Sequence, residues 1–156
     1  MNIPSKSTVS PLSRVAPLAL LLASANLYAQ QPMLISLNGD AEVPPVITTA
    51  KGTGQITVMP DRKVSGSIKV SGLVPTVAHI HEGAVGKNGP PIITLTQTAR
   101  DSFVVPAGAR LTNAQYTGFT SGNLYVNVHS AQYPNGEIRA QLLRSEAGAT
   151  PTRAAY

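Results

Sequence analysis

The sequence contains no cysteine and no tryptophan, and only 4% of its residues are aromatic. The lack of cysteine excludes disulfide bonds and thiolate chemistry, so stability must come from core packing, from sheet hydrogen bonds or from a bound metal. Charged residues are also scarce at 12%, whereas hydrophobic residues reach 42%. A chain of this composition is too apolar and too weakly charged to be disordered. Its core must be built from Val, Ile, Leu and Ala.

The sequence also lacks a run of about 18 apolar residues, which a membrane-spanning helix needs. A shorter apolar stretch follows Lys6 and Arg14 and precedes small residues, which is the pattern of a secretory signal peptide. We therefore expect residues 1–29 to be a signal peptide, cleaved after Ala25 or after Ala29; an uncleaved membrane anchor is the alternative. The expected location is secreted or periplasmic, with no transmembrane segment after cleavage.

Basic residues outnumber acidic ones, with 12 Lys and Arg against 7 Asp and Glu and a formal net charge of +5. They are scattered along the chain, and no stripe of aromatic residues lies between them. Nucleic-acid binding is therefore not expected. We expect this mild excess of positive charge to serve the solubility of the protein.

Thirteen glycines and thirteen prolines separate many short apolar runs, which is typical of strands joined by turns. The clearest alternation of apolar and polar residues is at 63–70, which we expect to pair with 53–59 as a half-buried hairpin. Further strands are expected at 33–37, 77–81, 92–96, 102–105, 124–129 and 136–143, and a short helix at 112–120. This pattern predicts one all-β domain at residues 31–144. We expect it to be an antiparallel Greek-key β-sandwich of seven or eight strands. A flexible tail is expected at 145–156.

All three histidines lie in two of the expected strands. Side chains alternate along a strand, so His79 and His81 share one face. Val126 and Val128 are expected in the core, which turns His129 outward. If these strands and the last one are neighbours, one outer surface collects His79, His81, His129, Glu137 and Arg139.

Three converging imidazoles are a ligand set that suits copper or zinc. The functional interpretation is a metal site formed by His79, His81 and His129, completed by Glu82, by Glu137 or by water. The alternative interpretation is structural, with each histidine hydrogen-bonded to the backbone or to Glu137. The sequence leaves both open.

Other polar residues favour structural roles. Glu137 and Arg139 alternate with core residues, and we expect a cross-strand ion pair between them. Glu42 is expected to pair with Arg139 or to cap a turn. The glycine-rich segment 83–89 lacks the strand–loop–helix context of a phosphate-binding loop, so we interpret it as a turn. No Ser-His-Asp set can be assembled, and no catalytic residue is predicted.

Five motifs follow one another in a distinctive order: GDAEVPPV at 39–46, AHIHEG at 78–83, GKNGP at 86–90, GNLYVNVH at 122–129 and YPNGEIRAQL at 133–142. Together they resemble the CHRD (chordin) domain family over about 34–143. One departure is Ala140, where family members commonly have glycine. The resemblance implies an immunoglobulin-like or Cu/Zn superoxide-dismutase-like β-sandwich, and in chordin itself it implies protein binding.

The resemblance favours an exported binding or scaffold module with a protein partner over an enzyme. The alternative is a copper- or zinc-binding protein that uses the three histidines. A second alternative is a metal-dependent oxidoreductase at the same site, because residues 72–73 and 79–82 resemble the copper-ligand strand of Cu/Zn superoxide dismutases. The disulfide pair, the catalytic arginine motif and the zinc loop of those enzymes are missing, which disfavours dismutase activity.

Overall fold

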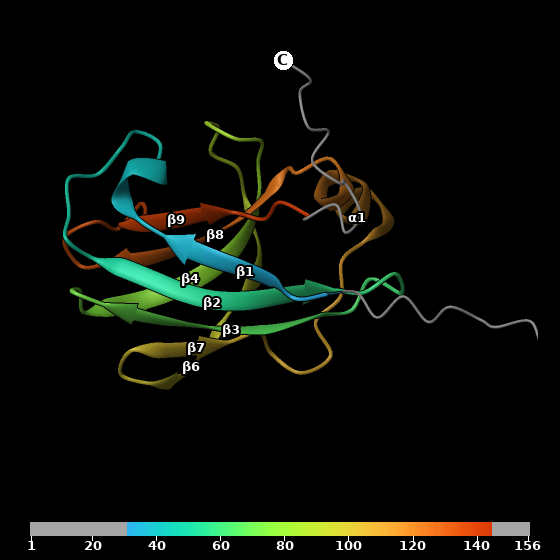
Figure 1. Cartoon of the computed structure of the whole chain (residues 1–156), viewed down its shortest axis with the longest axis horizontal. Helices are drawn as coiled ribbons and strands as arrows, with labels where there is room; N and C mark the ends of the chain where they lie inside the picture. The colour runs from blue at the N-terminus through green and yellow to red at the C-terminus, as the bar shows by residue number, and fades with distance from the viewer. Residues whose placement is uncertain (1–30, 145–156) are drawn as a thin grey trace, which may run out of the picture.

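A computed structural model describes residues 31–144, which form two β-sheets packed face to face (Figure 1). One sheet has the strand order β1-β2-β3-β7-β6 and the other the order β5-β4-β8-β9. Every pairing is antiparallel. The strands are β1 Met33–Leu37, β2 Lys51–Val58, β3 Val64–Ser71, β4 Pro75–Glu82, β5 Pro91–Thr94, β6 Thr96–Ala99, β7 Ser102–Val104, β8 Leu124–Ser130 and β9 Ile138–Gln141. The prediction of an all-β sandwich is confirmed.

The core lies between the two sheets and is built mainly from aliphatic side chains, as the composition requires. In β3, Val64, Ile68 and Val70 are buried, while the polar residues between them are exposed or half-buried. Each fully buried aliphatic side chain of this kind contributes about 1.5–3 kcal/mol to folding. The alternation of apolar and polar residues along the sequence therefore decides which face of each strand packs in the core.

The expected strand at 92–96 is two strands in the structure. The chain leaves the four-stranded sheet after β5, passes through the buried Leu95 and joins the five-stranded sheet as β6. The Leu95 N–H still donates to the carbonyl of Ala78 at 2.9 Å. All four residues of β6 are exposed, so no apolar alternation marks this strand in the sequence.

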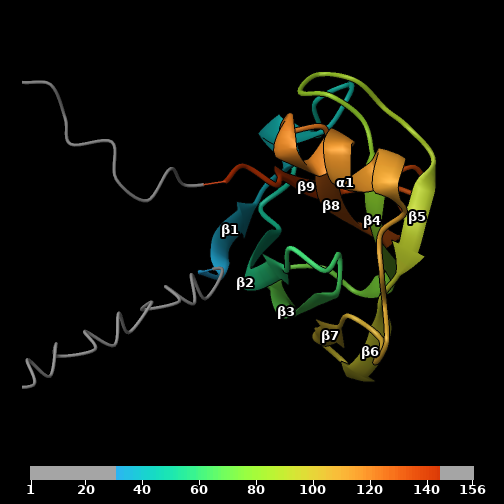
Figure 2. The ribbon, with the colours of Figure 1, turned by 90° about the vertical axis from the view of Figure 1, so that its right-hand side faces the viewer.

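The single α-helix of the described residues is α1, Asn113–Thr120, which lies at one end of the sandwich (Figure 2). Thr112 caps it through a capping box with Gln115. Gly122 follows the helix with φ +74°, a conformation that favours glycine. Phe119 is the residue that anchors the helix in the core. The helix expected at 112–120 is therefore confirmed.

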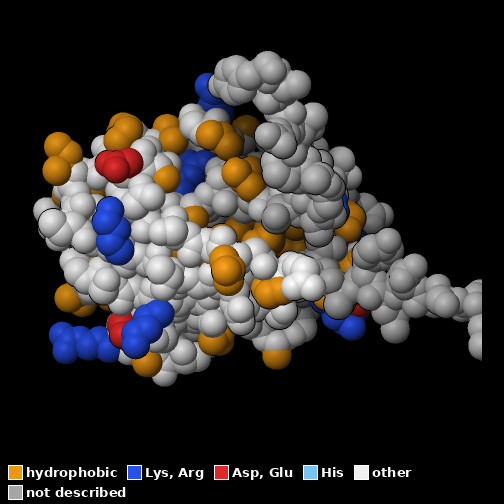
Figure 3. All heavy atoms as spheres, in the orientation of Figure 1, with side chains coloured by type: hydrophobic (Ala, Val, Ile, Leu, Met, Phe, Trp, Pro, Cys, Tyr) orange, Lys and Arg blue, Asp and Glu red, His pale blue; other side chains and the backbone are white. Residues whose placement is uncertain are grey.

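Charged side chains are scattered over the face shown in Figure 3 and do not gather into one patch there. Lys63 lies 3.1 Å from Asp61, and Lys69 lies 3.5 Å from Asp101. Such exposed pairs contribute about 0–1 kcal/mol each. They have little influence on the stability of the fold.

Two expectations concern residues that the structure does not describe. The signal peptide expected at 1–29 and the tail expected at 145–156 both lie outside 31–144. Within 31–144, no helix has the length and apolar character needed to cross a membrane.

Candidate metal centre

The three histidines come together where β4 and β8 run side by side. In this antiparallel pair, His79 lies opposite Asn127 and His129 lies opposite Val77. One ring nitrogen from each histidine lies within 4.8 Å of those of the other two. The structure thus brings together His79, His81 and His129, hereafter the histidine triad.

Two members of the triad are fixed by backbone carbonyls. His81 Nδ1 lies 2.8 Å from the carbonyl oxygen of Gly89, and His129 Nδ1 lies 2.9 Å from that of Pro134. A carbonyl only accepts, so in both rings Nδ1 carries the proton and donates it. In the neutral form of each ring, the Nε2 atoms of His81 and His129 therefore keep their lone pairs. This arrangement of a ligating nitrogen opposite an anchored N–H is the one found in metal-binding histidines.

His79 is held differently. Its Nδ1 lies 3.0 Å from Nε2 of His129. Because His129 Nε2 is an acceptor, His79 Nδ1 donates this hydrogen bond in the metal-free protein. The ring of His79 is half-buried, whereas those of His81 and His129 are buried.

The Nε2 atom of His81 is buried without a hydrogen-bond partner. Buried polar atoms are usually satisfied, because an unmade hydrogen bond costs about 1–3 kcal/mol. The anchored tautomer makes this atom an acceptor, and it belongs to a ring 5.3 Å from that of His79 between centroids. The Nε2 atom of His81 therefore has a free lone pair with which it can bind a metal ion.

Burial lowers the pKa of His79, and repulsion from His129 and His81 adds to this effect. Burial also lowers the pKa of His81, while the bond to Gly89 works in the opposite direction. Both shifts favour the neutral ring, which is the form that binds metals. The electrostatic environment therefore keeps His79 and His81 ready to ligate at neutral pH.

Tyr125 and Arg139 support His81 from the side. The Tyr125 ring stacks on that of His81 with 4.8 Å between centroids and 12° between planes. The Arg139 guanidinium carbon lies 3.5 Å from the Tyr125 ring centroid. Because β8 runs between β4 and β9, the imidazole and the guanidinium approach Tyr125 from opposite sides. The stack fixes the plane of the His81 ring.

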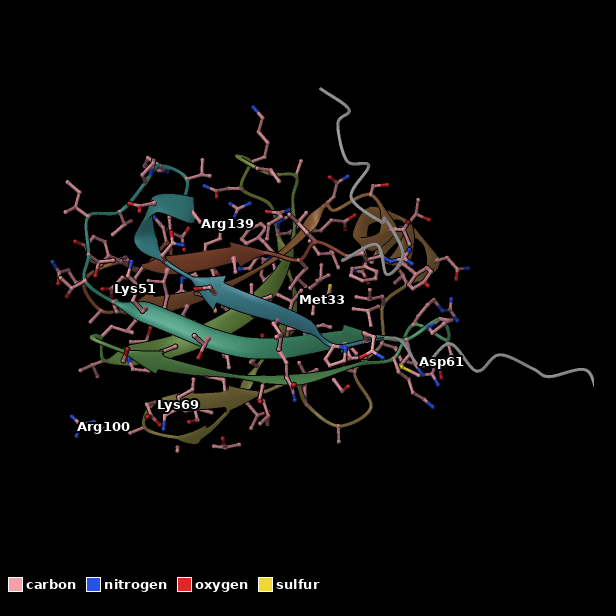
Figure 4. All side chains as sticks on the ribbon, viewed as in Figure 1. Met33, Lys51, Asp61, Lys69, Arg100 and Arg139 are labelled. Atoms are coloured by element: carbon pink, nitrogen blue, oxygen red, sulfur yellow. The ribbon has the colours of Figure 1, made fainter. Side chains whose placement is uncertain are left out.

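The expected ion pair between Glu137 and Arg139 was wrong. Both residues come from the same region of the chain, and each has other partners. Glu137 accepts a 2.7 Å hydrogen bond from the Thr48 hydroxyl. Arg139 donates to the carbonyl of Ala84 at 3.2 Å and to the side chain of Gln141 at 2.9 Å. Figure 4 labels Arg139 beside β9, near the short 3-10 helix η1, Gly39–Ala41.

The expectation of an exposed surface was also wrong, although the strand faces were assigned correctly. Only 7% of His81, 8% of His129 and 1% of Arg139 is exposed. Loops cover this face of the sheet, and they include residues 83–90 and the turn at 131–136, which carry the anchoring carbonyls. Strand alternation predicts the face on which a side chain lies, but not what packs above it.

Neither acid proposed as a fourth ligand joins the triad. Glu137 is occupied by Thr48. Glu82 follows His81 and therefore points to the other side of β4, where its carboxylate lies near Gly118 of α1. A fourth ligand would have to come from outside the described protein, as water or an incoming molecule.

Glu42 lies at the edge of the site and is buried. Burial raises the pKa of Glu42 to about 7, while the attraction of Arg139 lowers it. The expected direct ion pair with Arg139 is absent from residues 31–144, where only a longer-range attraction remains. The alternative expectation is met, because Glu42 caps the end of η1, Gly39–Ala41, by donating its backbone N–H to the carbonyl of Gly39. One carboxylate oxygen of Glu42 has no hydrogen-bond partner, and Asn127 is a neighbour on β8.

Sequence reasoning missed the supporting roles of Tyr125 and Asn127. Both share the face of His129 by strand alternation, which was the available signal. The anchoring carbonyls of Gly89 and Pro134 left no signal, because any residue supplies a carbonyl.

Comparisons with known proteins place the chain in one family. The model of the CHRD domain matches residues 33–142, which is more than half of the chain. Searches of curated proteins and of solved structures found no significant match. The matched segment contains all three histidines, the stacking Tyr125 and the buried Arg139. This chain therefore belongs to the CHRD domain family.

Proposed function

We propose that this CHRD domain is a binding module that holds a copper or zinc ion through His79, His81 and His129. Membership of the family supports a binding or scaffold module in general. The observation that supports a metal is the buried Nε2 of His81, which has no partner while its ring is fixed by Gly89. A structural histidine would use both ring nitrogens or expose one to water.

The spacing of the triad fits a transition metal. Metal–nitrogen bonds of about 2.0–2.1 Å at tetrahedral angles separate ligand nitrogens by about 3.4 Å. The 3.0 Å pair of His79 and His129 lies slightly below this value, and the 4.8 Å limit for the whole triad lies above it. Rotation of the unanchored His79 ring would widen its 3.0 Å contact with His129 to the tetrahedral value.

The ligand type selects the class of metal. Imidazole nitrogens suit copper and zinc, whereas calcium and magnesium prefer oxygen ligands. The triad includes no carboxylate. Three protein ligands leave one coordination position open, which is the arrangement of metal sites that react or exchange.

We also propose that the protein works outside the cytoplasm, as the N-terminal pattern indicates. Histidine ligands suit an oxidising compartment, because imidazole does not pass through the oxidation steps that cysteine does. N-terminal sequencing of the purified protein tests this point. A mature N-terminus after Ala25 or Ala29 is expected, and an N-terminus at Met1 would contradict cleavage of the signal peptide.

The oxidoreductase hypothesis gains no specific support. Within residues 31–144 the triad is the only cluster of this kind. A protein partner, which the resemblance to chordin implies, likewise stays a prediction. The metal-binding module is the proposal that the geometry favours.

The proposed function is tested by metal analysis of the full chain, produced without a polyhistidine tag. We expect about one copper or zinc per chain, retained through dialysis and absent from the triple variant His79→Ala/His81→Ala/His129→Ala. Lys69→Ala on the opposite sheet is the matched control and should keep its metal. Circular dichroism checks that the variants are folded. A folded wild-type protein that holds neither metal, even after both are added, would overturn the proposal.

A further inference from the structure

The members of the triad are not equivalent. His81 and His129 are buried and each donates to a backbone carbonyl. His79 is half-buried, and its Nδ1 contacts only another member of the triad. A ligand without an anchor and with access to water is the one that can leave a metal without disturbing the fold.

We infer that His79 is the exchangeable ligand of the site, and that the domain passes its metal to an acceptor molecule by ligand exchange at this position. The inference rests on the proposed function and extends it from metal binding to metal transfer. The acceptor is defined by its chemistry as a molecule that presents an unprotonated nitrogen ligand, such as an imidazole. His81 and His129 hold the ion until the acceptor has bound it. Further nitrogen ligands of the acceptor then replace their Nε2 atoms in turn, so both metal–Nε2 bonds break while the Nδ1 anchors stay in place.

The exchange step balances without a redox partner. A bond forms between the metal and the acceptor nitrogen, and the bond between the metal and His79 Nδ1 breaks. The oxidation state of the metal does not change. His79 then takes up a proton at Nδ1 from water and releases its Nε2 proton, so the ring stays neutral.

The metal-free geometry supplies a resting position for the released ligand. Once the ion has gone, His79 Nδ1 donates to Nε2 of His129 at 3.0 Å. The interaction replaces the lost metal bonds of both rings with one hydrogen bond. It also keeps the three rings close together for the next ion.

The other two histidines cannot rotate away from the ion in this way. Rotation of His81 would break its bond to Gly89 and its stacking on Tyr125. Rotation of His129 would break its bond to Pro134. Both movements would also leave an empty space where the buried ring now packs beneath the covering loops. The difference in anchoring thus predicts a fixed pair and one mobile ligand.

The first test is the kinetics of metal transfer from the loaded full chain to a coloured nitrogen chelator, followed by absorbance. The protein is loaded with copper or zinc, whichever it retains. Attack at an open position predicts a transfer rate that rises in proportion to the chelator concentration. A rate that is independent of chelator concentration would show release from a closed site and would overturn the inference. Absence of any bound metal would instead contradict the proposed function.

The second test compares single variants by metal content and dissociation constant. His79→Ala should still bind one ion per chain, with about 100-fold weaker affinity and faster release. His81→Ala and His129→Ala should lose the ion altogether. Thr94→Val, beside His79 on β5, is the control and should match the wild type. Equal losses in all three histidine variants, each folded by circular dichroism, would overturn the assignment of His79.

Discussion

His79 and His129 share a hydrogen bond between ring nitrogens 3.0 Å apart, with their ring planes at 78°. The contact joins two strands through side chains that lie diagonally across the β4–β8 pair. Nε2 of His129 accepts this hydrogen bond from His79, so a metal ion bound by these two nitrogens displaces a single hydrogen bond. The metal-free protein is thus already close to the geometry of a bound state.

Metal should stabilise the fold by an amount that grows with the logarithm of the free metal concentration. At a free metal concentration of 100 times the dissociation constant, the gain is about 2.7 kcal/mol in the free energy of unfolding. Thermal unfolding with and without added copper or zinc measures this gain. The triple histidine variant should show no rise in melting temperature. An equal rise in that variant would indicate binding elsewhere.

Metal binding should persist below the ordinary pKa of imidazole. The pKa values of His79 and His81 are lowered from 6.5 by burial, so these rings stay neutral as the pH falls through that value. Below the lowered pKa values, protons compete with the metal for the ring nitrogens and metal affinity declines. Dialysis at a series of pH values followed by metal analysis gives the profile. Loss of metal that begins well above pH 6.5 would be inconsistent with the lowered pKa values.

Glu42 should make the metal-free protein less stable as the pH rises. Its pKa is raised from 4.5 to about 7, so between these values the unfolded chain releases the proton while the folded one keeps it. Stability due to this group is present below pH 4.5 and is lost as the pH rises through 7. Glu42→Gln should remove this decline and gain on the order of 1 kcal/mol at pH 8. Urea unfolding at pH 5 and pH 8 compares the two proteins, and parallel pH profiles would refute the assignment.

Arg139 should be important for both stability and metal affinity. It is buried, donates to Ala84 and Gln141, and lies over Tyr125. Removal of a buried, hydrogen-bonded side chain of this size should cost about 2–4 kcal/mol in Arg139→Met. Because Tyr125 stacks on His81, metal affinity should fall as well. Denaturant unfolding and metal titration measure the two effects, and Arg144→Met serves as a control at an exposed position.

Gly89 should control the position of His81 through the backbone. A Cβ atom at Gly89 would lie 1.7 Å from the carbonyl oxygen of Glu82, so Gly89→Ala must displace the loop. Displacement moves the carbonyl that anchors His81 Nδ1. We expect about 10–100-fold weaker metal binding, the usual effect of losing a partner of a metal ligand. Val85→Ala, at an exposed position in the same loop, should bind as the wild type does; equal affinities in all three proteins would exclude this role.

The sequence by itself determined the class of fold and the faces of the strands. Alternation with a period of two placed Val126 and Val128 in the core, and it therefore turned His129 to the face shared by His79 and His81. The scarcity of aromatic residues restricted the core to mainly aliphatic packing, and the absence of cysteine excluded thiolate ligands for a metal. These conclusions depend on neighbours in the chain, which a sequence displays directly.

Only the tertiary structure decided the surroundings of that face. Residues 83–90 and the turn at 131–136 fold over it, so a surface that alternation predicts to be exposed is buried. The carbonyls of Gly89 and Pro134 select the tautomers of His81 and His129, and they leave His79 as the unanchored ligand. Backbone atoms are chemically the same at every position, so their role in a site depends on the path of the chain and not on the identity of the residue.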